Sequence, residues 1–342
     1  LLQLNEIPTT LIKCNLFMNF NSSTDTNQEK KKTIRSLEDC PEVLNIVNLI
    51  SAQNPLQKKR IHAFLKNQNE EYWDFAEDLS RILNHSFLTN EEERIQAARS
   101  YNKMCMDFLK EQIRFRKSGV YRINDASVAQ QEVYSDLNVM RYYMVGLLLS
   151  YLFWPNHYEL FRFFRENLPK KRISSYLEVG VGHGLFTSTI LSQFPEVKAT
   201  IIDISETSLR TAKEVLQTFQ VDHSEINFIL GDYVTTPIEE SCFDFIIMGE
   251  VLEHVNDAPA FLQRTKSLLS PDGKIYLSTA ANSPALDHVY HFHSADEIRD
   301  LLKSTGFKII SDLALASEDI PIERWEEELV TINYCALLKH EE

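Results

Sequence analysis

Leu177-Glu-Val-Gly-Val-Gly-His-Gly-Leu-Phe-Thr187 concentrates glycine as no other part of the chain does. The chain has nine glycines in 342 residues, and three of them, Gly180, Gly182 and Gly184, lie within five positions. The residues before them, 173–179, predict a short buried strand, and residues 185–194 predict the start of a helix. Glycine at such a turn lets the backbone pass close to a ligand, and the helix N-terminus offers free N–H groups. The stretch therefore predicts a loop that binds a nucleotide-type cofactor.

The spacing of the glycines differs from that of a dinucleotide-binding loop, which reads Gly-x-Gly-x-x-Gly. Here Glu178 stands two positions before Gly-x-Gly-x-Gly. Apolar runs at 199–204, 226–230 and 243–248 predict further strands, with helical segments between them. Regular alternation of strand and helix predicts a parallel sheet with helices on both faces. Asp203 ends the second predicted strand, where an acid in a doubly wound fold can bind both ribose hydroxyls.

These features, in this order, resemble the class I S-adenosylmethionine-dependent methyltransferases, over about 165 residues from Ser174 to Lys339. The resemblance implies an α/β fold with a doubly wound, Rossmann-like, seven-stranded methyltransferase domain. It also implies that the last two strands, near 307–316 and 329–338, form an antiparallel edge. The cofactor would be S-adenosylmethionine. The residues implied to bind it are Glu178, Gly180, Gly182, Gly184, Asp203, Ile204, Asp232, Tyr233, Gly249 and Glu250.

The same resemblance suggests roles for the acids among them. Glu178 would hold the methionine end of the cofactor, directly or through water. Asp203 would hold the ribose, and Asp232 would lie beside the adenine amine. The plainer interpretations are a cap at the end of a strand for Asp203 and a turn residue for Asp232.

Glu250-Val-Leu-Glu-His254 follows the fourth predicted strand, at the edge where doubly wound sheets bind their ligands. Glu250, Glu253 and His254 would share one face of a helical turn, and they are the candidate catalytic residues. His254 could act as a general base near neutral pH. The string also resembles the metal motif of small-RNA end methyltransferases, which use a further downstream histidine, and the ubiquinone-pathway O-methyltransferases. The candidate downstream histidines are His288, His291 and His293.

Three interpretations of this segment therefore remain open. It could supply a general base, it could hold a divalent ion at Glu250, Glu253 and His254, since carboxylates and neutral imidazole suit one, or it could form a pocket wall. We expect no resident metal, and the ion is the alternative.

The N-terminal half predicts helices over most of residues 1–165, before a methyltransferase domain at 166–342. We expect this helical region to form a lid over the substrate or a dimerisation surface, because methyl transfer depends mainly on alignment and exclusion of water. The residues expected to line the acceptor pocket are Tyr142, Tyr143, His157 and His291. The alternative for the tyrosines is a place in the helical core.

The distribution of charge along the chain argues against a nucleic-acid partner. The net charge is −14, with 22 Lys and Arg against 21 Asp and Glu in residues 1–170, but 13 against 28 in residues 171–342. An acidic catalytic half repels a phosphate backbone, so nucleic acid is not expected as a partner. A basic cluster at Lys110, Arg114, Arg116, Lys117 and Arg122 could bind a phosphate or a carrier protein, or be a solvated helix face.

The cysteines predict a reducing compartment, and the hydropathy predicts no membrane span. Five cysteines, Cys14, Cys40, Cys105, Cys242 and Cys335, have no paired or metal-type spacing, which predicts free thiols in a cytoplasmic protein. No run of 18 apolar residues predicts a membrane span, and the N-terminus has no signal-peptide pattern.

Together these patterns predict a transferase of small-molecule biosynthesis. It would move a methyl group to oxygen, nitrogen or carbon of a small, partly apolar metabolite, which could be phosphorylated or carried on a protein. The alternatives are a metal-assisted RNA-end methyltransferase and a non-catalytic binding or assembly protein that keeps the fold. A homodimer through the N-terminal helices is also possible.

Overall fold

The computed structural model of the protein describes residues 35–86, 88–218, 226–239 and 242–341. The predicted polar loop at 19–32 and Cys14 lie outside the described residues. Within the described residues, no helix is both long and apolar enough to cross a membrane.

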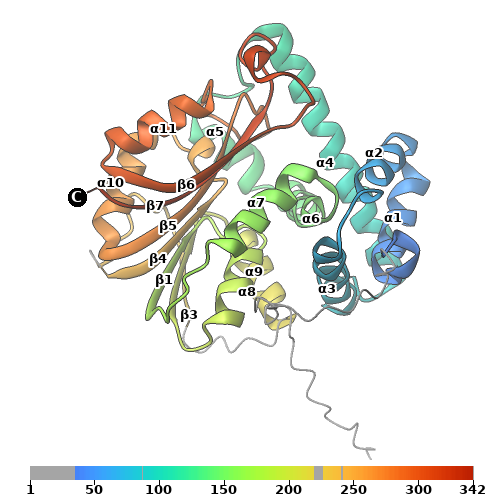
Figure 1. Ribbon diagram of the computed structural model, residues 1–342, viewed down its shortest axis with the longest axis horizontal. Coiled ribbons are helices and arrows are strands. Elements are labelled where there is room, and N and C mark those ends of the chain that lie inside the picture. Colours follow the sequence, from blue (N-terminus) through green and yellow to red (C-terminus); the bar gives the residue numbers. More distant parts are fainter. Residues whose placement is uncertain (1–34, 87, 219–225, 240–241, 342) are drawn as a thin grey trace, which may run out of the picture.

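The described strands form one seven-stranded sheet in the order β3-β2-β1-β4-β5-β7-β6 (Figure 1). Five of them run parallel, and β7 is antiparallel to both of its neighbours, β5 and β6. The predicted doubly wound α/β fold with an antiparallel edge is therefore confirmed. The strands are β1 (Ser175–Val179), β2 (Lys198–Asp203), β3 (Ile226–Leu230), β4 (Phe243–Gly249), β5 (Leu269–Ala281), β6 (Phe307–Ala316) and β7 (Ile332–His340).

Helices alternate with the strands of the sheet. They are α8 (Leu185–Gln193), α9 (Glu206–Thr218), the short turn η3 (Leu252–His254), α10 (Ala258–Leu268), α11 (Ala295–Ser304) and the short turn η4 (Ile322–Arg324). Because the parallel strands end at one edge, the loops after β1, β2, β3 and β4 meet there. This edge holds the candidate active site.

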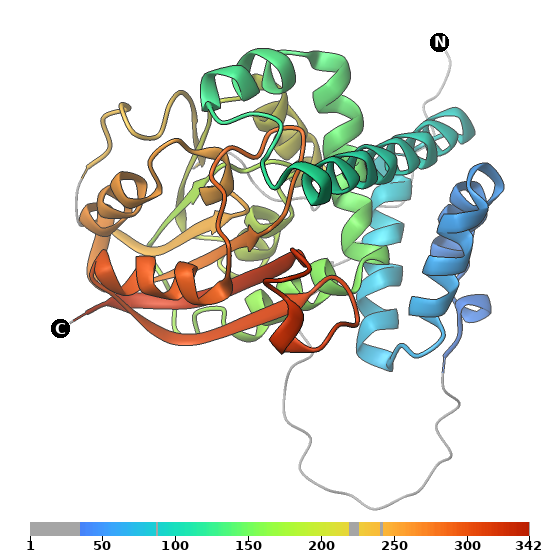
Figure 2. The ribbon, with the colours of Figure 1, turned by 90° about the horizontal axis from the view of Figure 1, so that it is seen from above.

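The region before the sheet is helical, as the sequence predicts. Its elements are η1 (Leu37–Asp39), α1 (Pro41–Gln53), α2 (Pro55–Leu65), α3 (Glu70–Ser86), α4 (Glu91–Ser118), α5 (Ala126–Ala129), the π-helical turn η2 (Gln130–Tyr134), α6 (Leu137–Phe153) and α7 (Pro155–Glu166). Figure 2 shows α1 to α3 at one end of the molecule and the sheet at the other, with the long α4 running from the helical end toward the middle.

Local sequence signals fix the ends of α4 and α6, two helices that line the cavity. At α4, the Asn90 side chain accepts a hydrogen bond from the backbone N–H of Glu93 (3.0 Å), and Gly119 ends the helix with φ 73°. At α6, Asp136 caps the first turn, and Pro155 prevents the helix from continuing past Trp154. Most residues of α6 after Met140 are buried, whereas Arg141 is exposed.

The hydrophobic core joins the two halves of the chain. One cluster of buried side chains runs from α1, α3, α4 and α6 through α7 and α8 to one face of the sheet, and includes Trp73, Phe161, Phe186 and Tyr276. A second cluster packs α10 and α11 on the other face. The N-terminal helices therefore pack continuously against the sheet and form a wall above its carboxyl edge.

Candidate active site

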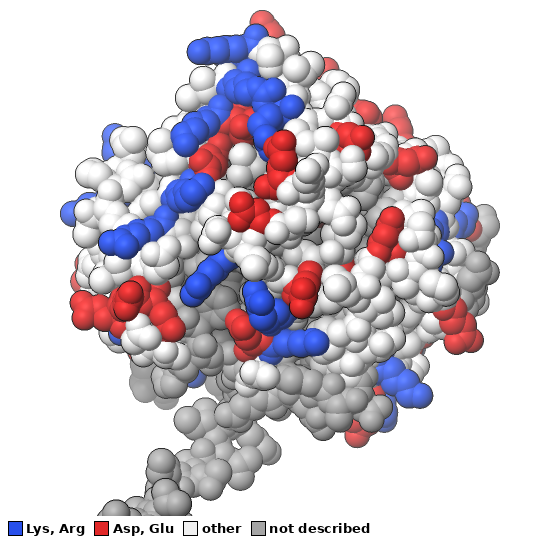
Figure 3. Space-filling model, turned by 180° about the vertical axis from the view of Figure 1, so that it is seen from behind, with Lys and Arg blue, Asp and Glu red and all other residues white. Residues whose placement is uncertain are grey.

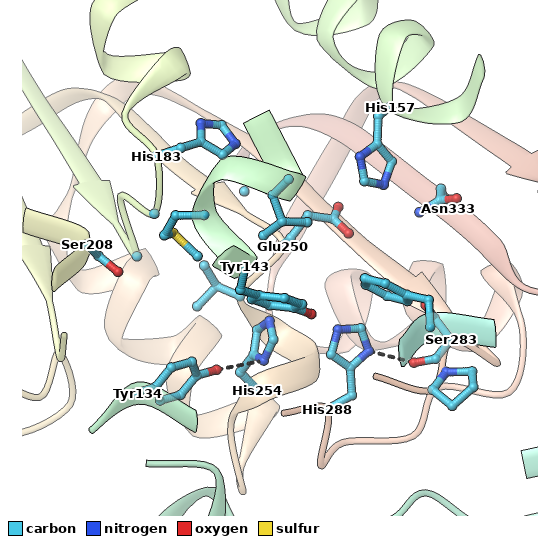
Figure 4. Close-up of a pocket in the computed structure, with 18 of the residues that line it drawn as sticks. Tyr134, Tyr143, His157, His183, Ser208, Glu250, His254, Ser283, His288 and Asn333 are labelled. Atoms are coloured by element: carbon cyan, nitrogen blue, oxygen red, sulfur yellow. Dashed lines mark hydrogen bonds between the residues drawn. The ribbon is translucent and has the colours of Figure 1, made fainter. Parts of the chain in front are cut away.

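A cavity of about 1280 Å³ lies between the carboxyl edge of the sheet and the N-terminal helices. It runs from the glycine loop after β1 past α6 to the side chains of α2 and α4. Sites for one drug-sized ligand are typically about 300–1,000 Å³, so this cavity has room for a cofactor and a second molecule. Figure 4 shows residues from both halves of the chain around it.

The glycine loop forms one end of the cavity. Gly180, Gly182 and Gly184 have φ values of 72°, 51° and 79°, a region that other residues enter only at a cost. A Cβ on Gly184 would lie 2.9 Å from the backbone of Ala212, whereas one on Gly182 would have only the Met144 sulfur nearby, at 3.9 Å. Gly184 is therefore required by packing, and Gly182 leaves space on the cavity side.

Glu178 lies behind this loop, away from the cavity lining. Its carboxylate accepts hydrogen bonds from the hydroxyls of Tyr176 and Thr187, and burial raises its pKa to about 7. These bonds tie β1 to the start of α8. In the structure Glu178 holds the loop and does not itself line the cavity.

Asp203 lines the cavity at the end of β2. Its carboxylate accepts the backbone N–H groups of Gly182 (3.3 Å) and Ser205 (2.7 Å), and burial raises its pKa to about 6. Ile204 beside it is half exposed at the same wall. An acid held in this way can turn its remaining lone pairs to a ligand.

Asp232 and Tyr233 follow β3 on the same wall. Asp232 accepts the backbone N–H of Val234 (2.7 Å), so it is a turn residue, and it also lines the cavity. Tyr233 is buried against Phe261, with its hydroxyl 3.0 Å from that of Thr265. The interpretation of Asp232 as a turn residue is therefore compatible with its expected place beside the adenine amine.

Gly249 and Glu250 end β4 at the centre of the cavity wall. Glu250 has a positive φ of 55°, which is uncommon for a residue with a side chain and is often found at functional sites. Its backbone N–H donates to the Ser278 carbonyl (3.0 Å). Burial raises its pKa, and within the described part of the chain its buried Oε1 has no hydrogen-bond partner.

Glu253 lies below the cavity lining and is fully buried. Its Oε2 accepts the hydroxyl of Thr279 (2.6 Å), and its backbone carbonyl accepts two N–H groups of the loop after β5. Burial first, and then the charge of Glu250, raise its pKa well above the ordinary value. Burial of this kind favours the neutral form of a carboxyl, which suits a structural role.

His254 lines the cavity and belongs to a polar network. Its Nδ1 lies 2.9 Å from the Tyr134 hydroxyl (Figure 4). It is also 3.1 Å from the backbone carbonyl of Asp287 and 3.5 Å from the Asp287 carboxylate. A carbonyl oxygen can only accept, so this contact puts the proton on Nδ1 and leaves Nε2 as the acceptor. Tyr143 also donates to the Asp287 carboxylate (3.2 Å).

Two predicted pocket residues line the cavity, and two do not. Tyr143 and His157 line it; Nδ1 of His157 is 2.6 Å from the Ser150 hydroxyl, and burial lowers its pKa to about 4. Tyr142 instead donates to Asp107 (3.0 Å) beneath Lys103, outside the lining.

His291 is also outside the lining. Its Nε2 lies 2.8 Å from the Asn282 Oδ1, and its ring packs between Phe115 and Tyr121. Tyr142 and His291, both expected at the acceptor pocket, therefore lie outside the lining of this cavity, because neighbouring elements hold both side chains elsewhere.

One group of possible metal ligands is found among the described residues. Ligand atoms of Glu253, His254 and His288 all lie within 4.8 Å of one another. The group differs from the predicted set because His288 takes the place of Glu250. Nδ1 of His288 is 2.5 Å from the Ser283 carbonyl, and burial lowers its pKa to about 4, so it is neutral and able to bind a cation through Nε2.

Two residues of the network were not singled out by sequence reasoning. Tyr134 belongs to the π-helical turn before α6, and Asp287 to the loop after β5. The available signal for Asp287 was an acid directly before three histidines in seven residues, His288, His291 and His293. Their meeting at His254 depends on tertiary packing.

Comparison with known proteins identifies the class of domain. Residues 152–312 match a family model described as "Methyltransferase domain". With its sheet order and glycine loop, the C-terminal part of this chain is a class I S-adenosylmethionine-dependent methyltransferase domain, as the motifs predicted.

Several individual proteins resemble the chain. The malonyl-[acyl-carrier protein] O-methyltransferase 1 of Ilyobacter polytropus is 31% identical over 182 residues, 49% of this chain and 62% of that protein. The ubiquinone biosynthesis O-methyltransferase of Rhodopseudomonas palustris is 33% identical over 107 residues, 30% of this chain and 38% of that protein. The chain thus spans less than two thirds of the length of either relative. The solved structure of N-methyltransferase NodS from Bradyrhizobium japonicum, in complex with S-adenosyl-L-homocysteine, is 17% identical, with a TM-score of 0.45 over 64% of this chain and 100% of that one.

Proposed function

We propose that the protein is an S-adenosylmethionine-dependent methyltransferase that acts on a small, partly apolar metabolite. The observation that carries this proposal is the arrangement of one cavity. The glycine loop and Asp203 line one end, and the network of His254, Tyr134 and Asp287 borders the same space. The relatives are named as O-methyltransferases, which favours an oxygen atom as the acceptor over nitrogen or carbon.

The residues on the first wall fit the cofactor. Asp203 would accept the ribose hydroxyls, Asp232 would lie beside the adenine amine, and the left-handed glycines would let the backbone approach the methionine end. The unpartnered Oε1 of Glu250 suits the ammonium group of that end. When bound, S-adenosylmethionine supplies an electrophilic methyl group.

His254 is proposed as the general base. Asp287 holds the Nδ1 proton of the imidazole, so Nε2 can take the proton of an acceptor hydroxyl as it becomes the nucleophile. Tyr134 and Tyr143 both donate to the Asp287 carboxylate and so fix its position. Positioning of the acceptor and exclusion of water would contribute most of the remaining rate enhancement.

The first test is a calorimetric titration of S-adenosylmethionine into the wild type, Asp203→Ala and the matched control Asp272→Ala, an exposed acid outside the cavity. We expect micromolar binding by the wild type and the control, and at least a tenfold loss in Asp203→Ala. Absence of binding by the wild type would favour the non-catalytic alternative.

The group of Glu253, His254 and His288 supports a second candidate, a metal-assisted reaction such as methylation of an RNA end. A turnover assay with acceptor hydroxyls, run with and without EDTA, separates the two. Full activity in EDTA supports base catalysis by His254. Loss that Mg²⁺ or Mn²⁺ restores would support the metal.

Three finer predictions belong to the same proposal. A cytoplasmic location is supported by the four cysteines of the described region, all of which are free thiols. The N-terminal helices would act as a lid and could also mediate a homodimer, which the hydrodynamic mass would test. The third is an acceptor that is phosphorylated or carried on a protein.

A further inference from the structure

The cavity continues well beyond the polar network around His254. Phe108 on α4 stacks on Tyr143, with ring centroids 6.0 Å apart and planes 14° apart, and so extends the wall away from the sheet. Beyond it lies an outer chamber between α2 and α4. This outer chamber is lined by Gln57, Arg60, Ala63, Phe64, Tyr101, Cys105, Phe108 and Leu109.

Most side chains that line the outer chamber are aromatic or apolar, and Gln57 and Arg60 on α2 are polar. Phe64, Tyr101 and Phe108 present aromatic rings, and the Tyr101 hydroxyl is occupied by a hydrogen bond from the Trp154 indole (3.0 Å). Burial raises the pKa of the Cys105 thiol to about 11, so the thiol is neutral. The middle of the chamber therefore suits a hydrocarbon chain.

Arg60 ends the chamber with a positive charge. Its side chain is exposed, and no carboxylate in the described part of the chain forms an ion pair with it. Gln57, one helical turn earlier, lines the same end and is 8% exposed. A guanidinium is suited to bidentate binding of a carboxylate or phosphate.

The basic cluster predicted on α4 does not offer the same free charge. Figure 3 shows a row of Lys and Arg side chains on the back of the molecule with Asp and Glu side chains beside it. Most of the predicted cluster is in ion pairs: Lys110 with Asp107, Arg114 with Glu111, Arg116 with Glu318 and Arg122 with Glu132. The charge of Arg60 is therefore the better candidate for a ligand.

The two ends of the cavity differ in charge, which would orient an acceptor. Asp203, Asp232 and Glu250 line the end assigned to the cofactor, so an anionic group is disfavoured there and favoured at Arg60. A molecule with one polar reacting end and one anionic end can then bind in only one direction.

We propose that the outer chamber binds the tail of the methyl acceptor, and that the acceptor is an elongated amphiphile. Its reacting hydroxyl lies at His254, its hydrocarbon middle passes Tyr143 and Phe108, and its carboxylate or phosphate contacts Arg60. The identity of the reacting end rests on the proposed function, whereas the tail site does not require catalysis.

The test uses dodecyl phosphate, dodecanoate and dodecanol as probes, below their critical micelle concentrations. Each is titrated by calorimetry into the full chain, with and without S-adenosylhomocysteine. The variants are Arg60→Gln and the matched control Lys59→Gln, which changes the adjacent exposed cation outside the cavity. Thermal melting of each variant checks that it is folded.

We expect both anionic probes to bind at least tenfold more tightly than dodecanol. Arg60→Gln should remove that preference, and Lys59→Gln should leave it within twofold. Shorter probes should lose roughly fourfold in affinity per buried methylene removed. A preference for phosphate over carboxylate, or the reverse, identifies the anionic group of the acceptor.

Equal binding of dodecanol and the anionic probes, or an unchanged preference in Arg60→Gln, would overturn the assignment of Arg60. Absence of binding by all three probes would overturn the tail site as a whole. The binding of S-adenosylhomocysteine to the wild type is measured by a separate titration. Its failure to bind would refute the proposed function, while the amphiphile titrations would still decide the tail site.

Discussion

Replacing Asp203 by asparagine should stabilise the ligand-free protein and weaken its binding of the cofactor. Burial raises the pKa of Asp203 from an ordinary 3.8 to about 6. The ionised carboxylate therefore destabilises the fold by about 3 kcal/mol well above pH 6. Asparagine removes that charge but accepts only one of the two backbone N–H groups, from Gly182 and Ser205, which costs about 1 kcal/mol. Asp203→Asn should thus gain about 2 kcal/mol at pH 8.

The dependence on pH gives this prediction a defined sign. A raised carboxyl pKa means that the folded chain binds the proton more tightly than the unfolded chain does. The wild type therefore loses stability as pH rises from 3.8 to about 6, by about 1 kcal/mol already at pH 4.5 and about 3 kcal/mol at pH 8. The advantage of Asp203→Asn should consequently disappear near pH 4.5, while other titrating groups contribute equally to both proteins.

Urea unfolding at pH 4.5 and pH 8, with and without S-adenosylhomocysteine, measures these differences. At one hundred times its dissociation constant, the ligand should stabilise the wild type by about 2.7 kcal/mol. Asp203→Asn should gain much less, because an amide cannot accept both ribose hydroxyls, so the order of stability reverses when ligand is added. If ligand-free Asp203→Asn has a lower free energy of unfolding than the wild type at pH 8, the burial argument is refuted. Equal stabilisation of both proteins by ligand would refute the ribose assignment.

Other substitutions test the loop and the network. Gly182→Ala should cost about 1 kcal/mol in urea unfolding, because its φ is 51°, and should weaken S-adenosylhomocysteine binding; Gly184→Ala should cost more, because a Cβ there meets backbone at 2.9 Å. Equal losses of stability would contradict the packing difference. His254→Gln should lower kcat by roughly 10²–10⁴-fold with unchanged cofactor affinity, and a smaller loss would argue against a base. Asp287→Asn should lower kcat with unchanged cofactor affinity, because the Asp287 carboxylate lies 3.5 Å from the imidazole and accepts the hydroxyls of Tyr134 and Tyr143 beside it; an unchanged kcat would leave Asp287 a structural role. Tyr142→Phe should cost about 1 kcal/mol of stability through its lost bond to a carboxylate, with KM unchanged, and a raised KM would return it to the pocket.

Adjacent residues show where reasoning from the sequence stops. Tyr142 and Tyr143 follow one another on α6, and successive residues of a helix point about 100° apart. Because α6 is buried on nearly all sides, its apolar pattern does not tell which face meets the cavity. Packing turns Tyr143 to the cavity and Tyr142 to Asp107. His291 likewise carried the right chemistry in the right loop, but its ring is held between Phe115 and Tyr121.

The sequence alone determined the features that depend on neighbours along the chain. Glycine spacing predicted a turn that only positive φ angles allow, and apolar runs ending at Asp203 and Gly249 predicted the parallel strands and the edge where they end. Such signals act over a few residues, because backbone sterics and strand alternation are local. The tertiary structure alone decided which distant side chains share the cavity. It brought Tyr134 and Asp287, 153 positions apart, into one hydrogen bond, and it closed the chamber at Arg60 with α2 and α4, which are distant from the glycine loop in the sequence. Contacts of this kind depend on how buried surfaces fit together in three dimensions, which no local pattern records.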